Sequence, residues 1–438
     1  MPRQACPIVE NGVLSWRGWK RYIRFSAAPS KSRQWRLAGF SIFTGGSPSA
    51  CAQSARPACA WYNTDAMLQL PANTRGKAPI DLPLLLSVIA ISIGGVLAIR
   101  SVVISDPSGP LFIRKQIIGI VAGVIGLSVF AFNDYKILLP RLSLFLSVVN
   151  VGLLAIVFKL GHAAKGAQRW IPLGPVQFQP SEVAKLVVII ALGVFLARRR
   201  GEITRPKTMF GSLGVILAPF ALIFLQPDLG TGLVIISIWF GMVFVAGMRL
   251  RHVAIVVAAG LLLFSALWST GKIKDYQKQR LTSFINPAAD PRDTGYHLRQ
   301  SQIAIGAGQV TGQGYGRGMQ ASGHFIPEQH TDFIFTVVGE EGGFVGAISL
   351  LALYLFALMR CVWVMAMTKD YFGRLLVAGV VSLLGFHIIV NIGMTMGVMP
   401  VTGVPLPFFS YGLSALLIDF SAIGIVLSVA RRTQDTIF

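Results

Sequence analysis

The chain has 438 residues, of which 53% are hydrophobic and only 13% are charged, and its mean hydropathy is +0.64. Soluble globular domains carry about 25% charged residues, so this composition indicates a membrane protein and excludes a soluble enzyme, a secreted domain and a disordered chain. Lys and Arg number 39 against 18 Asp and Glu, a net charge of +21. In so apolar a chain this excess is typical of cytoplasmic loops and does not indicate a nucleic-acid partner.

Residues 1–66 differ from the rest of the chain. They are basic, rich in Ser and Ala, and hold no apolar run long enough for a signal peptide or a membrane span. We expect a dispensable extension, either unstructured or preceding a natural start at Met67. The alternative is a tryptophan-bearing basic segment that binds the anionic inner face of the membrane. Three of the four cysteines fall here and the fourth is Cys361, a spacing that supports neither a disulfide framework nor a zinc site.

Residues 67–438 are expected to form one membrane domain. A helix needs about 20 mainly apolar residues to cross a bilayer, and ten segments qualify. They are residues 80–99, 116–133, 137–159, 181–198, 209–226, 229–247, 252–269, 333–358, 373–396 and 408–430. The fold class predicted is therefore all-α and polytopic, with ten transmembrane helices. The chain at 159–181 and at 270–332 is too polar to cross.

Clusters of Lys and Arg set the predicted orientation. They lie at 198–207, 249–251, 360–374 and 431–432, always on the same side of the ten segments. The positive-inside rule assigns that side, with both termini, to the cytoplasm. The long loop at 270–332 then faces outward, and because it is itself basic, we expect it to meet an anionic partner.

Two charged residues lie at the start of the fourth predicted span. Glu182 and Lys185 are three residues apart on one helix, so they can pair with each other. Such a pair either only neutralises itself or belongs to a polar site. The Gln-Pro-Ser turn beside it faces the same outer side as the long loop, which favours the site.

The long loop carries three further signals. Pro291 disfavours helix at Asp290 and holds that carboxylate in an extended or turn backbone. A glycine-rich run at 306–318 allows N–H groups to approach a phosphate, although such runs are often merely flexible. At the mouth of the eighth predicted span, residues 328–332 then place an acid, a base and another acid close together.

These motifs, in this order, resemble the SEDS family (RodA, FtsW and their sporulation relatives), and within it the RodA branch. The resemblance covers essentially residues 75–432. The matching motifs are Arg169-Trp170-Ile171-Pro172-Leu173-Gly174, Gln179-Pro180-Ser181-Glu182, Gln226-Pro227-Asp228-Leu229-Gly230-Thr231, Asp290-Pro291 with Gly295-Tyr296-His297, Pro327-Glu328 with His330-Thr331-Asp332-Phe333, and Asn391-Ile392-Gly393-Met394 with Pro405-Leu406-Pro407-Phe408.

The resemblance implies a peptidoglycan glycosyltransferase of the inner (plasma) membrane. It would polymerise lipid II into β-1,4 glycan strands on the outer face for cell elongation and rod shape, with undecaprenyl pyrophosphate as leaving group. The implied partners are a class B penicillin-binding protein and other membrane proteins of the elongation complex. The expected cofactor is a divalent cation, Mg²⁺ or Mn²⁺, with no organic cofactor.

Two other functions compete with this one. A lipid II flippase needs a polar pathway open alternately to both sides, whereas the charged motifs here crowd the outer half. A scaffold without chemistry of its own would leave the outer carboxylates unexplained. The polymerase is therefore the favoured hypothesis.

The resemblance assigns catalysis to Asp290, as the base that deprotonates the acceptor hydroxyl. Lys185 and basic residues of the long loop are candidates for stabilising the departing pyrophosphate. No metal ligands are assigned. The predicted substrate-binding residues are Gln179, Glu182, Lys185, Asp228, Gln300, Ser301, His330, Asp332 and Ser410.

Two positions depart from the family pattern. Leu413 stands where the family usually has a glycine, so a turn that needs positive φ there would have to be rearranged. Gln177 stands where many RodA members carry an arginine, which weakens any expectation that a guanidinium grips a phosphate at that position.

The predicted orientation can be tested by labelling. A cysteine introduced near Gly316 should react with a membrane-impermeant thiol reagent in intact spheroplasts, because the arginine clusters place the long loop outside. Labelling that requires lysis would reverse the orientation of the whole chain.

Overall fold

The computed structural model describes most of the membrane domain. It covers residues 80–433 and the backbone of a few short strands before residue 43, but not residues 105, 161, 165–166, 174–175, 271–277, 279, 281, 285–293 and 324. The chain divides into two units, Met1–Gly76 and Lys77–Phe438. The predicted boundary at Met67 and most of the predicted extension lie outside the described residues.

The described residues of the first unit form short antiparallel strands. They pair in the orders β1-β2-β3 and β4-β5. The strands are β1 (Val9–Glu10), β2 (Val13–Leu14), β3 (Ile23–Arg24), β4 (Trp35–Leu37) and β5 (Phe40–Ile42).

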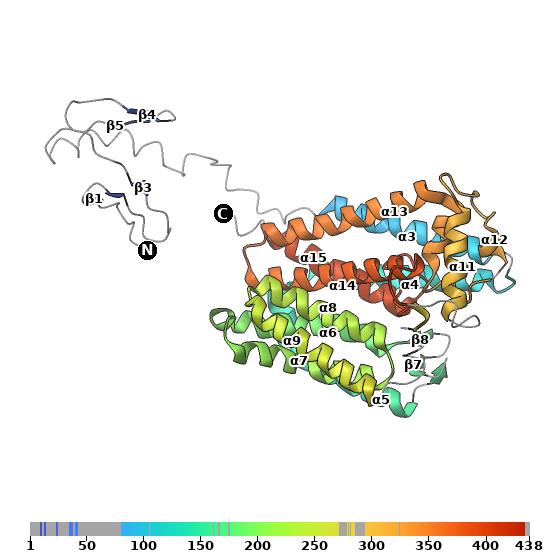
Figure 1. Cartoon of the computed structure of the whole chain (residues 1–438), viewed down its shortest axis with the longest axis horizontal. Coiled ribbons are helices and arrows are strands. Elements are labelled where there is room, and N and C mark those ends of the chain that lie inside the picture. Colours follow the sequence, from blue (N-terminus) through green and yellow to red (C-terminus); the bar gives the residue numbers. More distant parts are fainter. Residues whose placement is uncertain are drawn as a thin grey trace. The chain divides into compact units, whose positions relative to one another are not determined.

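The second unit is a bundle of long α-helices (Figure 1). In the described part of the chain, nine helices are long and apolar enough to cross a membrane. These are α3 (Leu82–Val102), α4 (Gly109–Phe132), α5 (Tyr135–Leu160), α6 (Pro180–Arg198), α7 (Pro206–Leu225), α8 (Leu229–Ala246), α13 (Ile334–Met367), α14 (Tyr371–Thr395) and α15 (Leu413–Thr433).

The remaining predicted span, at 252–269, is helix α9 (Leu250–Ser269), whose apolar stretch Arg251–Ala266 is shorter. The all-α polytopic fold is therefore confirmed, while the count of ten spans stays a prediction.

Three of the spanning helices begin at an aspartate. The side chain of Asp81 accepts a hydrogen bond from the Leu84 N–H at 3.1 Å, and Asp370 accepts one from Gly373 at 2.7 Å. Asp228 caps α8 in the same way through Thr231. An N-cap carboxylate satisfies an otherwise unbonded N–H and interacts favourably with the helix dipole. The position of these three aspartates is therefore explained by their role in capping the starts of helices.

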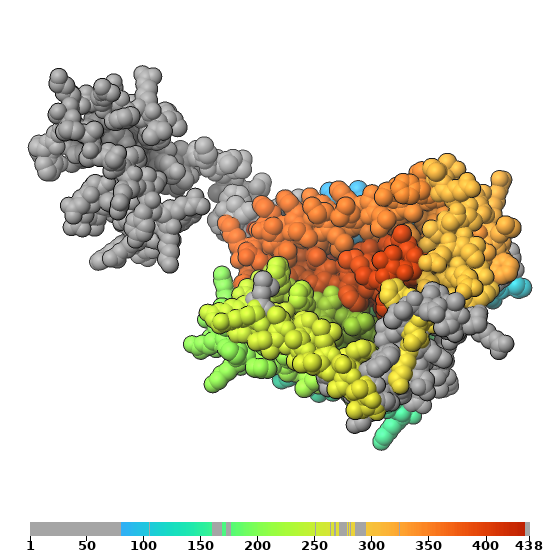
Figure 2. Space-filling model, in the orientation of Figure 1, coloured from blue at the N-terminus to red at the C-terminus, as the bar shows by residue number. Residues whose placement is uncertain are grey.

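Short elements gather at one end of the bundle (Figure 1). Between α5 and α6 runs a three-stranded antiparallel sheet in the order β6-β7-β8, and the described part of the long loop includes α11 (Thr294–Ala307) and α12 (Met319–Ser322). Figure 2 shows α11, in amber, at this end and next to α13 in orange. The strands are β6 (His162–Ala164), β7 (Ala167–Leu173) and β8 (Val176–Phe178); the 3₁₀ helix η3 (Arg200–Glu202) lies between α6 and α7.

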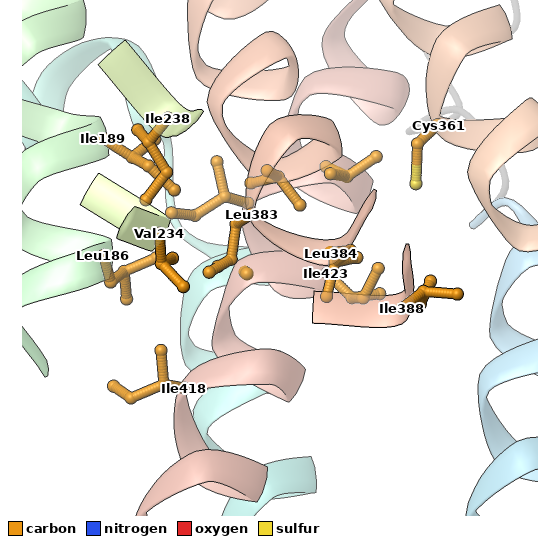
Figure 3. Packing of buried hydrophobic residues seen from close by; sticks show 14 of the residues in the cluster. Leu186, Ile189, Val234, Ile238, Cys361, Leu383, Leu384, Ile388, Ile418 and Ile423 are labelled. Carbon is orange, nitrogen blue, oxygen red and sulfur yellow. The ribbon is translucent and has the colours of Figure 1, made fainter. Parts of the chain in front are cut away.

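Helix α14 lies at the centre of the packing, against α6, α8, α13 and α15, and α15 packs along α4. Figure 3 shows Leu186 and Ile189 of α6 beside Val234 and Ile238 of α8, next to Leu383 of α14. Lipid tails are as apolar as leucine, so helices in a bilayer are held together by close packing and not by exclusion from water. The large apolar side chains that α3, α4 and α5 leave exposed suit a surface in contact with lipid.

The glycine-rich run folds back against the start of α13. The N–H groups of Gln313 and Gly314 donate to the carbonyl oxygens of Glu340 and Glu341, at 3.0 Å each. The Glu340 carboxylate accepts from the N–H groups that begin α12, at 2.7 and 3.1 Å. These N–H groups thus bind the protein itself and brace the long loop against α13.

Close contact at this brace requires glycine. A Cβ at Gly308 would overlap the carbonyl oxygen of Gly339. Gly308→Ala should therefore lower the free energy of unfolding by about 1–3 kcal/mol, the usual cost of overpacking, and lower the Tm of the purified protein in detergent.

The matched control is Gly306→Ala. A Cβ at this exposed α11 position meets nothing within 4 Å, so the Tm should stay the same or rise slightly. Equal Tm values for the two variants would contradict the close contact.

Candidate active site

A cavity of about 760 Å³ lies at the end of the bundle where α6 and α8 begin. Its walls come from these two helix starts, from β7, from the segments at 327–333 and 401–415, and from α14. Since α6 runs from this cavity to the basic cluster at 198–207, the cavity lies at the opposite end from that cluster. This is the end that the sequence predicts to face outward.

A buried ion pair lies on the wall of the cavity. The Lys185 ammonium is 2.7 Å from a carboxylate oxygen of Glu182, and the two side chains are only 1% and 5% exposed. The predicted pairing of these residues is confirmed. Glu182 lies in the first turn of α6, where the helix dipole favours a negative charge. On its other side the ammonium lies 3.3 Å from Nε2 of His387, on α14.

A second acid is held by several donors at the start of α8. Besides capping the helix, Asp228 accepts hydrogen bonds from the hydroxyl of Thr231 at 3.0 Å and the amide of Gln179 at 3.4 Å. The guanidinium of Arg169, on β7, lies 3.6 Å from the same carboxylate and also donates to the carbonyl of Pro227. Asp228 thus ties the sheet to the turn between α7 and α8.

Asp332 lies at the cavity just before α13. Its carbonyl oxygen accepts a hydrogen bond from the side-chain amide of Asn391 at 2.9 Å, and the same amide donates to the carbonyl of Val404 at 2.7 Å. Gly403 has φ of +72°, and a Cβ there would lie 3.2 Å from a carboxylate oxygen of Asp332. Asn391 therefore fixes the backbone that presents this carboxylate.

Tyr411 forms part of the cavity wall. Its N–H donates to the carbonyl of His330 at 2.9 Å, and burial raises the pKa of its phenol. The phenol is therefore protonated at neutral pH and is available as a donor.

The charged lining is mixed in sign. It comprises three cations, Arg169, Lys185 and Arg280, and four carboxylates, Glu182, Asp228, Glu328 and Asp332. The Glu182–Lys185 and Arg169–Asp228 ion pairs neutralise two of these cations and two of these carboxylates. The Arg280 guanidinium donates to the carbonyl of Thr402 at 3.0 Å.

The structure brings five of the predicted substrate-binding residues together. Gln179, Glu182, Lys185, Asp228 and Asp332 all line the cavity. Asp290, the predicted catalytic base, lies outside the described residues, so its role stays a prediction.

Four other predicted residues do not line the cavity. The buried hydroxyl of Ser301 donates to the carbonyl of Thr395 at 2.6 Å, and that of Ser410 accepts from the Leu406 N–H at 2.8 Å. Gln300 is half-buried on α11.

His330 packs edge-on between two aromatic rings, with centroids 4.8 Å from Phe112 and 5.3 Å from Tyr411. Like Ser301 and Ser410, it organises the cavity's surroundings.

The sequence analysis did not identify His387 or Tyr411 as site residues, whereas Arg280 is one of the long-loop basic residues that it considered for the pyrophosphate. His387 is a single histidine within an apolar span, a pattern that gives no local signal. Only the packing of α14 on α6 brings it to Lys185.

Both departures from the family pattern are accommodated. Leu413 begins α15 and packs on α4 near Gly119, so the expected rearranged turn is not required. Gln177 is exposed on β8 and lines the cavity, and its carbonyl accepts from Ser414 at 3.4 Å.

Removing one partner of the buried pair should be costly. Glu182→Ala or Lys185→Ala leaves a buried charge without its counterion, which typically destabilises by about 3–5 kcal/mol. Each variant should therefore show a lower Tm in detergent or a lower folded yield.

The exposed pair of Glu202 and Arg205 has the same spacing and provides the control. Glu202→Ala should change stability by at most about 1 kcal/mol. If the buried and the exposed variants behave alike, the Glu182–Lys185 pair is solvated and not structural.

Comparison with known proteins gives a consistent result. The family described as cell cycle protein (FTSW_RODA_SPOVE) matches residues 81–435. The peptidoglycan glycosyltransferase MrdB of Escherichia coli (strain K12) is 40% identical over 287 residues, covering 65% of this chain and 76% of the relative. The peptidoglycan glycosyltransferase RodA of Treponema pallidum (strain Nichols) is 34% identical, covering 82% and 99%.

Solved structures agree with this result. A chain from a study of the structural coordination of polymerization and crosslinking by a peptidoglycan synthase complex has a TM-score of 0.70 and 34% identity, with 81% and 98% of the two chains covered. The rod shape determining protein RodA of Thermus thermophilus has a TM-score of 0.61 and 31% identity, with 81% and 97% covered. The resemblance inferred from the motifs is thus confirmed, and the chain belongs to the FtsW/RodA/SpoVE family, the SEDS family, and is RodA-like.

Proposed function

We propose that this chain is a peptidoglycan glycosyltransferase that polymerises lipid II into β-1,4 glycan strands. Relatives that are named peptidoglycan glycosyltransferases and match most of this chain support the activity. The structural observation that supports this activity is the cavity, in which carboxylates and cations meet at one end of a bundle of spanning helices.

The reaction has three physical requirements. A base takes the proton from the acceptor sugar hydroxyl, cations stabilise the departing undecaprenyl pyrophosphate, and apolar surface at the bilayer admits the polyprenyl tails. Inversion from an α-linked donor to a β-1,4 product needs one base and no covalent intermediate.

Two carboxylates are candidates for the base. Asp290 is the candidate from the sequence. Asp332 is the candidate from the structure, because it lies on the cavity with its backbone held by Asn391. Glu182 and Asp228 are less suited, since Lys185 and Arg169 already pair with these two carboxylates.

Lys185, Arg169 and Arg280 are the cations proposed to stabilise the leaving diphosphate. All three line the same cavity as Asp332. Fixed positive charges aimed at a developing anion act strongly in a site that excludes water. Gln177, which stands where many RodA members have an arginine, lies on the same wall and carries no charge. We therefore propose that the guanidinium groups of Arg169 and Arg280, which also line the cavity, contact the diphosphate.

We expect the divalent cation, Mg²⁺ or Mn²⁺, to bind together with the diphosphate of the substrate. Within the ranges that the structure describes, no group of three or more His, Cys, Asp or Glu could hold a metal ion. Mg²⁺ is commonly held by one or two carboxylates together with substrate phosphates. The proposed roles of the residues do not depend on it.

The same geometry disfavours a lipid II flippase. The charged cavity occupies one end of the bundle, and the helices below it pack through apolar side chains such as Ile189, Leu192 and Val243. A flippase needs a polar path to both sides.

The chain is a multi-pass membrane protein, and we place it in the inner membrane. We propose a class B penicillin-binding protein as partner, together with other membrane proteins of the elongation complex. The support is the similarity to a chain from a peptidoglycan synthase complex that coordinates polymerization and crosslinking.

Asparagine substitution tests the base. It removes the proton acceptor but keeps the size of the side chain, so folding and partner binding should survive. A positioned base contributes about 10²–10⁴-fold in rate. Polymerisation of lipid II by Asp290→Asn, purified with its cognate partner, should thus fall by about two orders of magnitude or more, with lipid II binding largely retained.

Two further variants complete this experiment. Asp293→Asn, three residues on and outside the motif, should be nearly silent. Asp332→Asn tests the structural candidate: if it abolishes polymer while Asp290→Asn still makes long strands, the base is Asp332. Wild-type protein that moves lipid II across vesicles but makes no polymer would refute the proposed function itself.

A further inference from the structure

The contact between Lys185 and His387 joins two helices at the wall of the cavity. Lys185 lies on α6 and His387 on α14, 202 residues apart in sequence, with Nζ and Nε2 separated by 3.3 Å. His387 is fully buried and belongs to the residues that line the cavity. We propose that His387 is a positioning residue that orients the Lys185 ammonium toward the diphosphate of the lipid-linked donor. This inference rests on the proposed function.

The hydrogen-bonding chemistry of the two groups supports this role. An ammonium group has three N–H donors and no acceptor, so Lys185 donates and the imidazole accepts. His387 must then be neutral, with its proton on Nδ1. A protonated ring would place two cations 3.3 Å apart.

The ammonium is held between these two groups. It forms an ion pair with Glu182, 2.7 Å away, and donates a hydrogen bond to His387 at 3.3 Å. The hydrogen bond restricts the rotation of the ammonium group about its terminal C–N bond. Because Lys185 and His387 both line the cavity, the orientation that His387 sets decides how the ammonium meets an anionic group that enters there.

Among the described residues, the charges around His387 come from two helices. Helix α6 contributes Glu182 and Lys185, and α15 contributes the buried Asp419, which interacts electrostatically with both. Asp419 also accepts a hydrogen bond from the backbone N–H of Phe408 in the outer loop. The residues of α8 that share the cavity wall, Thr231 and Val234, are uncharged. Lys185 is therefore the cation that His387 contacts, and the histidine acts on chemistry through it.

Two substitutions of similar size separate positioning from space filling. His387→Gln keeps an acceptor at nearly the same reach, whereas His387→Met keeps the volume with only a weak thioether acceptor. With the full-length protein and its partner, His387→Met should reduce kcat for lipid II polymerisation by about 10- to 100-fold, the range expected for losing a hydrogen bond to a charged group. KM should change little, because the lost interaction acts on the leaving group as its charge develops. His387→Gln should stay within about threefold of wild type.

Rates are compared per amount of folded, monodisperse protein. His252, a buried histidine at the start of α9 and outside the cavity, gives the matched control; His252→Met and His252→Gln should both keep the wild-type rate. His387→Phe, which keeps a ring without a nitrogen acceptor, replaces His387→Met if the latter does not fold.

A wild-type kcat for the variant without an acceptor overturns the inference. So does a His387→Gln rate as low as that of His387→Met, because the ring and not the acceptor would then matter. Neither result affects the proposed function, which is tested separately by whether the wild-type protein makes polymer.

Discussion

The buried ion pair of Glu182 and Lys185 constrains how the rest of the bundle is arranged. Two charges at 5% and 1% exposure inside spanning helices are tolerated only with good geometry and further hydrogen bonds. Helix α6 provides the geometry through its three-residue spacing, and α14 provides an additional partner, His387. Helices α6, α14 and α15 must therefore pack closely at the cavity wall, where α15 adds the buried Asp419.

Side-chain hydrogen bonds tie the irregular segments of the chain to the helices. The amide of Gln226 donates to the carbonyl of Leu154 at 2.7 Å, and the hydroxyl of Tyr354 donates to that of Pro407 at 2.6 Å. Asn391 binds two carbonyl groups in the same way. Non-helical backbone at membrane depth persists only where the protein or a water-filled cavity satisfies it. These donors thus hold the cavity open while the segments at 327–333 and 401–415 line it.

The arrangement suits chemistry at one membrane face. Charged groups that could move a proton or stabilise a leaving anion meet at one end, and apolar packing closes the other. Several acids are not part of that chemistry. Asp81 and Asp370 begin helices, Asp81 also pairs with Arg360 of α13 at 2.7 Å, and Glu340 braces the long loop. A count of carboxylates near the spans would therefore overestimate the catalytic candidates.

Much of the helical framework could be predicted from the sequence because its signals are local. The predicted spans at 181–198 and 229–247 correspond to Pro180–Arg198 and Leu229–Ala246. Apolar length defines both helices, together with a proline at the start of the first and a capping aspartate, Asp228, at the start of the second. The eighth span was predicted to end at residue 358, but α13 continues to Met367. Beyond residue 358, Arg360 pairs with Asp81 of α3 and lies over the ring of Trp363, so the last turns depend partly on a distant helix.

At the candidate site, too, local contacts could be predicted from the sequence and contacts between helices could not. Glu182 and Lys185 could be paired from sequence because helix geometry alone brings residues three apart together. Ser301 and Ser410 show the opposite case. The sequence analysis predicted that they bind substrate, and in the structure their hydroxyls form hydrogen bonds with the backbone at Thr395 and Leu406. The sequence by itself determined the spans, the family and the local ion pair. Only the tertiary structure decided that His387 and Asp419 join that pair, because no periodicity within one helix encodes which residue of another helix will face it.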